Sequence, residues 1–132
     1  MSENNLFLAE EWFKKANDDF AFAQHGFAEG FYSHVCFLCQ QVCEKYLKGY
    51  LVFNGIDPPR THSLTRLAGM CETIAPGFLE MVPAYDDLNI FYISSRYPAS
   101  WPGLIISEEQ ARETLQIAEQ TISLVRKLVY GK

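Results

Sequence analysis

The sequence predicts an all-α fold, an antiparallel up-and-down bundle of four main helices plus one short helix. Four segments repeat their apolar residues at steps of three and four, which is the spacing of one face of an α-helix. No segment shows the apolar–polar alternation of a β-strand bounded by hairpin turns. No long linker separates the segments, and short connections favour antiparallel neighbours.

Composition indicates one folded domain over residues 1–132. A chain of this length that is 48% hydrophobic and 14% aromatic can bury a core without disulfides or metals. Its net charge of -5 opposes unassisted binding to duplex nucleic acid, which requires a basic surface. No apolar run has the length of a membrane span, and the first residues lack the features of a signal peptide. We therefore expect a cytoplasmic protein with reduced cysteines and no membrane partner.

Two long helices are expected at the start of the chain. The first is predicted over residues 6–28 and ends at Gly30, and the second over residues 31–53. Because only the Gly30 junction separates them, the two helices are predicted to form an antiparallel hairpin. The expected buried stripe of the first helix contains Leu8, Trp12, Ala16, Phe20, Ala23 and Phe27.

The expected second helix has an apolar and a polar side. Cys36, Cys39 and Cys43 fall on the apolar side, where a thiol behaves as a small buried hydrophobe. The same three thiols could in principle bind zinc, but no fourth ligand is near in sequence, so we expect neither a metal nor a cofactor. The apolar side also holds Val35, Tyr46, Leu47, Tyr50 and Leu51, and the polar side holds Gln40, Gln41, Glu44, Lys45 and Lys48.

Two shorter helices are expected next. Ser63 is the predicted N-cap of a short helix that reaches residue 74. Pro83 suits the first turn of a helix over residues 84–95, because proline is tolerated where no backbone donor is needed. The expected inner face of the helix over residues 84–95 contains Leu88, Phe91, Tyr92 and Ser95.

The last helix has the clearest start signal. Residues 97–103 contain two prolines and a glycine and are predicted to form a loop. Ser107 and Gln110 then form a capping box, in which each side chain satisfies a backbone group at the helix start. The apolar stripe that follows requires a long partner helix, and it contains Ala111, Leu115, Ala118, Ile122, Val125 and Val129.

The polar side of the second helix admits two interpretations. Gln41, Glu44, Lys45 and Lys48 lie three or four residues apart and therefore share a face. Two lysines beside a glutamine can hold a phosphate, since ammonium and amide groups both donate hydrogen bonds. The alternative is a solvated face on which Glu44 and Lys48 form a helix-stabilising ion pair at i and i+4.

Further candidates lie before the short helix and after the fourth segment. His62 can serve as a general base, a phosphate contact or a group that only packs against its turn. Arg96 stands where a helix is expected to end, and a guanidinium there can bind a phosphate or carboxylate, or cap the helix. Tyr97 and Trp101 can stack on a base or cover an edge of the core.

In their order along the chain these segments resemble the HEPN domain family, and the resemblance covers nearly the whole sequence. The matching stretches are WFKKANDDF at residues 12–20, GFY at 30–32, QQVCEKYLKG at 40–49, HSL at 62–64 and SRYP at 95–98. The resemblance implies an up-and-down bundle that is often a homodimer. It also implies a nucleotide ligand and a small nucleotidyltransferase as protein partner, commonly in a toxin–antitoxin pair.

The resemblance also bears on catalysis. Many members of the family are ribonucleases that use an Arg followed after four to six residues by a His. Arg96 stands at the Arg position, but residues 97–103 contain no His. We therefore expect a binding module rather than a self-sufficient enzyme, with a dimeric interaction module or an RNA-cleaving toxin based on His62 as alternatives. The nucleotide- or phosphate-binding residues that carry over are Lys45, Lys48, His62, Arg96 and Tyr97.

Overall fold

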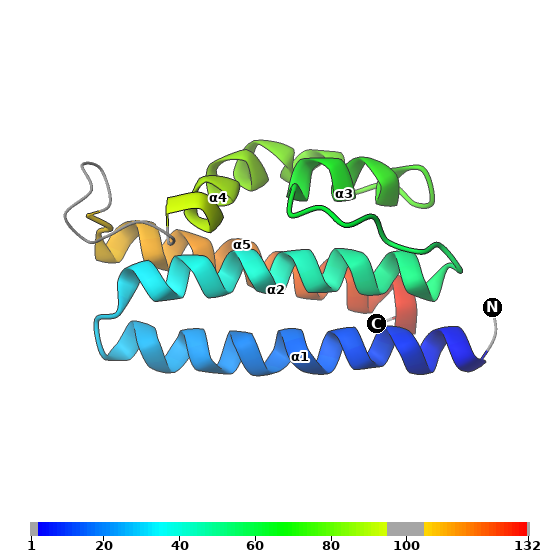
Figure 1. Cartoon of the computed structure of the whole chain (residues 1–132), viewed down its shortest axis with the longest axis horizontal. Helices are drawn as coiled ribbons and strands as arrows, with labels where there is room; N and C mark the ends of the chain where they lie inside the picture. Colours follow the sequence, from blue (N-terminus) through cyan, green and yellow to red (C-terminus); the bar gives the residue numbers. More distant parts are fainter. Residues whose placement is uncertain (1–2, 95–104, 132) are drawn as a thin grey trace.

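A computed structural model of the chain describes residues 3–94 and 105–131 (Figure 1). No strand occurs in these ranges, so the predicted all-α class is confirmed. No helix in them is both long and apolar enough to cross a lipid bilayer. The elements are α1 (Glu3–Ala28), α2 (Tyr32–Phe53), α3 (Leu64–Glu72), the 3₁₀ turn η1 (Leu79–Met81), α4 (Val82–Ser94) and α5 (Glu108–Tyr130).

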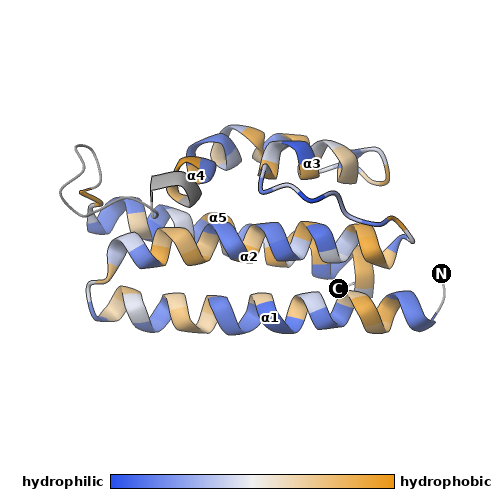
Figure 2. Cartoon of the chain, in the orientation of Figure 1, coloured by the Kyte–Doolittle hydropathy of each residue, from blue (hydrophilic) through white to orange (hydrophobic). Residues whose placement is uncertain are grey.

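Helix α2 is the centre of the bundle. It packs against α1, α3, α4 and α5, whereas α1 and α5 have much less contact with each other. α1 runs beside α2 as its antiparallel partner, and α3 and α4 lie together on another side of α2 (Figure 1). Every helix carries both hydrophilic and hydrophobic residues along its length (Figure 2). In α2, polar as well as apolar side chains are buried, because neighbouring elements surround this helix.

The predicted caps and junctions are present. Gly30 adopts the left-handed conformation, with φ of 84°, and the Phe31 amide donates to the Gly26 carbonyl at 2.9 Å, which turns the chain from α1 into α2. Ser63 accepts from the Arg66 amide at 3.2 Å and caps α3. Both hydrogen bonds of the capping box form at the start of α5.

Three boundaries differ from the predictions by two or more residues. α1 begins at Glu3, three residues earlier than predicted. α4 begins at Val82 rather than at residue 84, because η1, which was not predicted, leads directly into it. α3 ends at Glu72 instead of residue 74, where the Ile74 and Ala75 amides both donate to the Cys71 carbonyl in a final turn.

The buried face of α1 is displaced by one residue from the predicted stripe in its first half. Ala9 and Phe13 are buried, whereas Leu8 is 43% exposed. The reason is aromatic packing, because the Phe13 ring stacks on Tyr46 of α2 with ring centroids 4.8 Å apart. The prediction was therefore wrong for Leu8 and for half-buried Trp12. Farther along, the predicted Ala16 and Ala23 are buried and Phe20 and Phe27 are partly buried.

The buried face of α5 includes two threonines that the apolar stripe did not contain. Thr114 and Thr121 are buried, and the Thr121 hydroxyl lies 2.6 Å from the hydroxyl of Tyr85 in α4. Burial raises the pKa of Tyr85 well above its ordinary value, so this phenol stays neutral. The predicted positions Ala111, Ala118 and Val125 are buried, while Leu115, Ile122 and Val129 are only partly buried.

All four cysteines are packing groups of the core. Cys36, Cys39, Cys43 and Cys71 are free thiols and fully buried. Burial raises the pKa of Cys36 to about 11 and that of Cys43 and Cys71 to about 12, and it raises the pKa of Cys39 further. They are therefore protonated at neutral pH and poor nucleophiles. Within the described ranges, no three His, Cys, Asp or Glu side chains are grouped so as to hold a metal ion.

The crossing of α1 over α2 depends on Gly49. A Cβ at this position would lie 2.5 Å from Cε1 of Phe13 and 3.1 Å from Cβ of Trp12. We expect Gly49→Ala to lower the free energy of unfolding by about 1–3 kcal/mol, because the rigid Phe13–Tyr46 stack must shift. Urea denaturation followed by circular dichroism measures this change.

Gly69 provides the matched control for this substitution. It lies inside α3, and a Cβ there would meet no atom within 4 Å. Gly69→Ala is expected to raise the free energy of unfolding by about 0.5–1 kcal/mol, since alanine restricts the unfolded chain without a clash. A Gly49→Ala variant as stable as the Gly69→Ala variant would contradict the close helix crossing.

Candidate functional site

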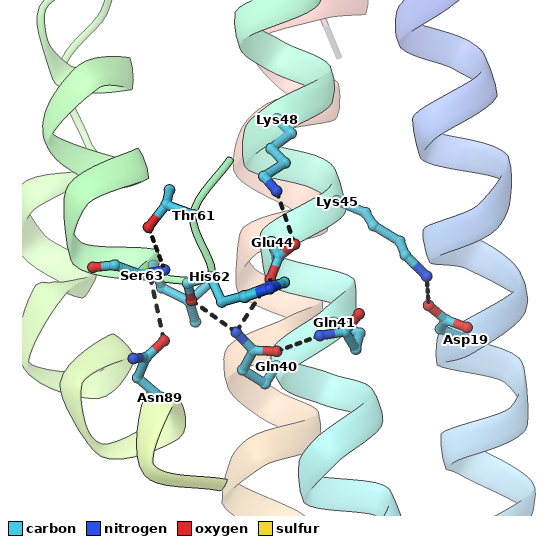
Figure 3. A network of polar contacts seen from close by, with 11 residues as sticks. Asp19, Gln40, Gln41, Glu44, Lys45, Lys48, Thr61, His62, Ser63 and Asn89 are labelled. Carbon is cyan, nitrogen blue, oxygen red and sulfur yellow. Dashed lines mark hydrogen bonds and ion pairs between the residues drawn. The ribbon is translucent and has the colours of Figure 1, made fainter. Parts of the chain in front are cut away.

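Three residues on the polar side of α2 are buried. Gln40 is 0% exposed, Glu44 5% and Lys48 8%. The connection from α2 to α3 passes over these residues at His62 (Figure 3), and the Lys48 ammonium lies 5.9 Å from the centre of the Trp12 ring of α1. The interpretation of this side as a solvated face was therefore wrong for Glu44 and Lys48, which neighbouring segments cover, whereas Gln41 and Lys45 are half-buried. The Glu44–Lys48 ion pair that the interpretation included is present.

Glu44 is the centre of a polar cluster, which we name the Glu44 network and which comprises Gln40, Glu44, Lys48 and His62. Lys48 Nζ lies 3.0 Å from Glu44 Oε2. His62 Nδ1 lies 3.0 Å from Glu44 Oε1, and Gln40 Nε2 lies 3.5 Å from the same oxygen. Both carboxylate oxygens therefore have partners, as a buried carboxylate requires.

Two glutamines attach the α2–α3 connection to α2. Gln40 Nε2 donates to the backbone carbonyl of His62 at 3.1 Å. Gln41 Nε2 donates in turn to Gln40 Oε1 at 2.7 Å, which fixes the orientation of the Gln40 amide. His62 is thus held at its backbone by Gln40 and at its ring by Glu44 (Figure 3).

Two further hydrogen bonds fix the residues that follow His62. The Ser63 amide donates to Thr61 Oγ1 at 3.1 Å, and the Leu64 amide donates to Asn89 Oδ1 of α4 at 3.4 Å (Figure 3). These bonds satisfy backbone donors at the start of α3, which have no partner within the helix. The segment from Thr61 to Leu64 is therefore held between α2 and α4, and the position of His62 is preorganised.

The His62 ring connects the buried network to the surface. Its side chain is 53% exposed, whereas the side chains of Glu44 and Lys48 are 7% and 10% exposed. Because Nδ1 faces Glu44, Nε2 lies on the opposite edge of the ring from the carboxylate. An imidazole held in this way can donate to an anion when protonated and can accept a proton when neutral.

The structure brings together some of the residues that the sequence suggested and separates others. Lys48 and His62 meet at the Glu44 carboxylate. Lys45 forms an ion pair with Asp19 of α1 and points away from Glu44 (Figure 3). The predicted contributions of Arg96, Tyr97 and Trp101 lie outside the described residues, and so does the predicted loop over residues 97–103.

Sequence reasoning did not identify Gln40 and Glu44 as site residues, although one signal was available. Gln40, Glu44 and Lys48 repeat at steps of four, which aligns them on one line of the helix. A polar line of this kind on a helix with little other solvent-facing surface indicates a buried network. The partner His62 follows Glu44 by 18 residues, so no local pattern could reveal the contact.

Comparison with known proteins identifies the same fold and the same family. The sequence pattern of the HEPN domain matches residues 9–128. The crystal structure of TT1696 from Thermus thermophilus is similar with a TM-score of 0.82 and 27% identity, over 90% of this chain and 96% of that chain. The structure of ST0689, an archaeal HEPN homologue, is similar with a TM-score of 0.75 and 30% identity, over 92% of this chain and 97% of that one. No curated protein matches the chain significantly.

Loss of the Lys48 ammonium is expected to destabilise the fold strongly. Lys48→Met removes the buried partner of Glu44 Oε2 and leaves a buried carboxylate without its ion pair. We expect the free energy of unfolding to fall by about 3–5 kcal/mol, measured by urea denaturation. A second substitution, Glu44→Gln, in the same chain should restore part of this loss, because no buried charge then remains uncompensated.

Lys14→Met is the control for an exposed ion pair. Lys14 and Glu11 lie 3.9 Å apart with side chains that are 76% and 50% exposed. Water already solvates both groups, so the expected change is below about 1 kcal/mol. If Lys48→Met and Lys14→Met lowered stability equally, the Glu44–Lys48 pair would not be a buried structural interaction.

Proposed function

The chain belongs to the HEPN domain family, and we propose that it is a nucleotide-binding module whose phosphate contact is His62. The observation that carries this proposal is the half-exposed His62 ring, which a buried carboxylate and a buried glutamine hold in one position. A phosphate-binding group needs a positive donor at the surface and a fixed direction. His62, anchored at its Nδ1 edge to Glu44, meets both requirements when the imidazole is protonated.

Charge balance supports His62 as the group that contacts the phosphate. Lys48 and Glu44 form a neutral pair beneath the surface. Protonation of His62 therefore adds a net positive charge at the edge of this pair, in a protein that is acidic overall. Because the ring is already fixed, binding loses little side-chain entropy. Lys48 acts in this proposal through Glu44, since a direct phosphate contact would require its ammonium to leave the carboxylate.

The remaining predicted residues complete the proposed site. Arg96 would neutralise further phosphate charge through a bidentate contact, and Tyr97 would stack on the base. Lys45 would contribute only if a phosphate replaced Asp19 as its partner. Membership in the family supports a small nucleotidyltransferase as the protein partner, in a toxin–antitoxin-like pair, and a homodimer as the assembly.

Nucleotide binding is tested by isothermal titration calorimetry. We expect saturable binding of at least one of ATP, GTP and their monophosphates at neutral pH. His62→Ala should weaken that binding by about tenfold or more, the factor that corresponds to a charge-assisted hydrogen bond of roughly 1.5–3 kcal/mol. Because the half-exposed ring makes no large contribution to the core, the variant is expected to remain folded.

His34→Ala is the matched control, because His34 is an exposed histidine of α2 near its start, far along the helix from Lys48. Its nucleotide affinity should equal that of the natural protein. Absence of heat with every nucleotide, or equal affinity of the His62→Ala variant and the natural protein, would refute the proposal.

A second candidate function is RNA cleavage, and the Glu44–His62 pair is the observation that favours it. A carboxylate that accepts from Nδ1 fixes the tautomer of the ring and makes Nε2 a proton acceptor, which is the arrangement of a general base. In this candidate function His62 replaces the family histidine that is missing after Arg96. A 2′-hydroxyl of RNA would be the group that loses its proton.

RNA cleavage is tested with purified protein and a single-stranded RNA in the presence of EDTA. If His62 is the base, His62→Ala should reduce the cleavage rate by about 10²–10⁴-fold, while His34→Ala leaves it unchanged. Intact RNA after incubation with the natural protein would exclude this candidate and would leave the nucleotide-binding proposal standing.

A further inference from the structure

A cleft between α1 and α5 lies apart from the Glu44 network. It has a volume of about 230 Å³. The first half of α1 and the last two turns of α5 form its walls, where the C-terminal end of the chain approaches α1 (Figure 1). The lining residues that matter are Phe7, Glu10, Lys14 and Asn17 of α1 and Arg126 and Tyr130 of α5.

The buried phenol of Tyr46 orients Asn17 and interacts electrostatically with Arg126. Tyr46 of α2 is fully buried, and its hydroxyl donates to Asn17 Oδ1 at 2.6 Å. The Arg126 guanidinium lies close enough to the same hydroxyl to lower its pKa, which partly offsets the increase that burial causes. Because the Asn17 oxygen faces Tyr46, the Asn17 amide group directs its two N–H donors elsewhere. One side chain of the core thus orients the Asn17 amide in one wall of the cleft and interacts electrostatically with the Arg126 guanidinium in the other.

Arg126 is a cation without an ion-pair partner among residues 3–94 and 105–131. Its guanidinium lies over the Tyr130 ring at 4.9 Å from the ring centre, which fixes the plane of its donors. By contrast, Arg112 on the same helix is paired with Glu108 and Glu109. In a chain with net charge -5, an arginine that no described carboxylate pairs with keeps guanidinium donors with which it can bind an external carboxylate.

The opposite wall supplies a fixed negative charge. Glu10 Oε2 accepts from the Tyr130 hydroxyl at 2.7 Å, which links α1 to the end of α5. This hydrogen bond occupies one carboxylate oxygen, and the carboxylate has further acceptor capacity. Glu11 and Lys14 compensate each other at the rim of the cleft. The cleft therefore offers one guanidinium and one carboxylate, and the exposed ring of Phe7 provides an apolar wall.

We propose that this cleft binds a small zwitterion of the amino-acid class with an apolar side chain. The carboxylate of the ligand would accept from Arg126 and from the Asn17 amide. Its ammonium would donate to Glu10, and its side chain would lie against Phe7. A simple anion would meet repulsion from Glu10 and a simple cation repulsion from Arg126, so the pair of charges selects a ligand that carries both.

The experiment compares three probes in titrations followed by ¹H–¹⁵N NMR of the whole chain. L-Phenylalanine carries both charges, 3-phenylpropionate lacks the ammonium, and 2-phenylethylamine lacks the carboxylate. L-Phenylalanine should bind saturably and shift the side-chain amide signals of Asn17. Each of the other two probes should bind at least about tenfold more weakly than L-phenylalanine, since one charge-assisted contact is missing.

Variants identify the site of binding. Arg126→Gln should weaken L-phenylalanine binding about tenfold or more, while Arg112→Gln, an exposed substitution on the same helix, should leave it unchanged. Tyr46→Phe keeps the ring stacked on Phe13 but removes the hydroxyl that orients Asn17, and it should also weaken binding. Nucleotide binding is expected to be unaffected in all three variants.

Three results would overturn the proposal. The first is the absence of saturable binding of L-phenylalanine. The second is equal affinity for 3-phenylpropionate, which would mean that the cleft binds anions alone. The third is unchanged binding by the Arg126→Gln variant, which would locate the probe elsewhere on the protein.

Discussion

The Glu44 carboxylate is a charged group that the bundle encloses, and much of the structure near α2 is arranged to satisfy it. An uncompensated buried charge strongly destabilises a fold, so each carboxylate oxygen requires partners. Lys48 provides one from the next turn of the same helix, and His62 provides another from the α2–α3 connection. The path of that connection over α2 therefore follows from the requirements of the carboxylate. A hydrophobic residue at this position would remove one of the anchors of the connection, the contact with the His62 ring.

The same interaction joins stability to the proposed function. The segment from Thr61 to Leu64 is fixed by Gln40 on one side and by Asn89 on the other, so the His62 ring reaches the surface in one orientation. The fold thus supplies the preorganisation that a phosphate contact or a general base needs. Because Lys48 neutralises Glu44, the electrostatic character of the surface at this point depends on the protonation of His62.

Buried polar groups of helix α2 orient side chains at two separate places on the bundle. Glu44 and Tyr46 are two residues apart, so they leave the helix in directions that differ by about 200°. Glu44 positions His62 of the α2–α3 connection, and Tyr46 positions Asn17 of α1. In each case a buried polar group of the central helix orients more exposed groups on its neighbours. The described part of the bundle therefore carries two polar clusters, each built on a buried group of α2.

Features that depend on neighbouring residues could be predicted from the amino-acid sequence. The helical segments, the Ser63 cap, the Ser107–Gln110 capping box and the Gly30 junction all follow from local patterns, and together these segments also indicated the HEPN family. For the candidate site, sequence reasoning named Lys48 and His62, which the fold brings together at Glu44. The binding roles of these two residues, and of Lys45, Arg96 and Tyr97, stay predictions.

The packing of the helices determines which side chains meet. The Phe13–Tyr46 stack sets the rotation of α1, and covering segments turn the polar side of α2 from a solvated face into a buried network. Packing also separates Lys45 from Lys48, because Asp19 lies on the neighbouring helix. The physical reason is that periodicity reports which face of a helix a residue occupies, whereas burial and pairing depend on residues far away in the chain.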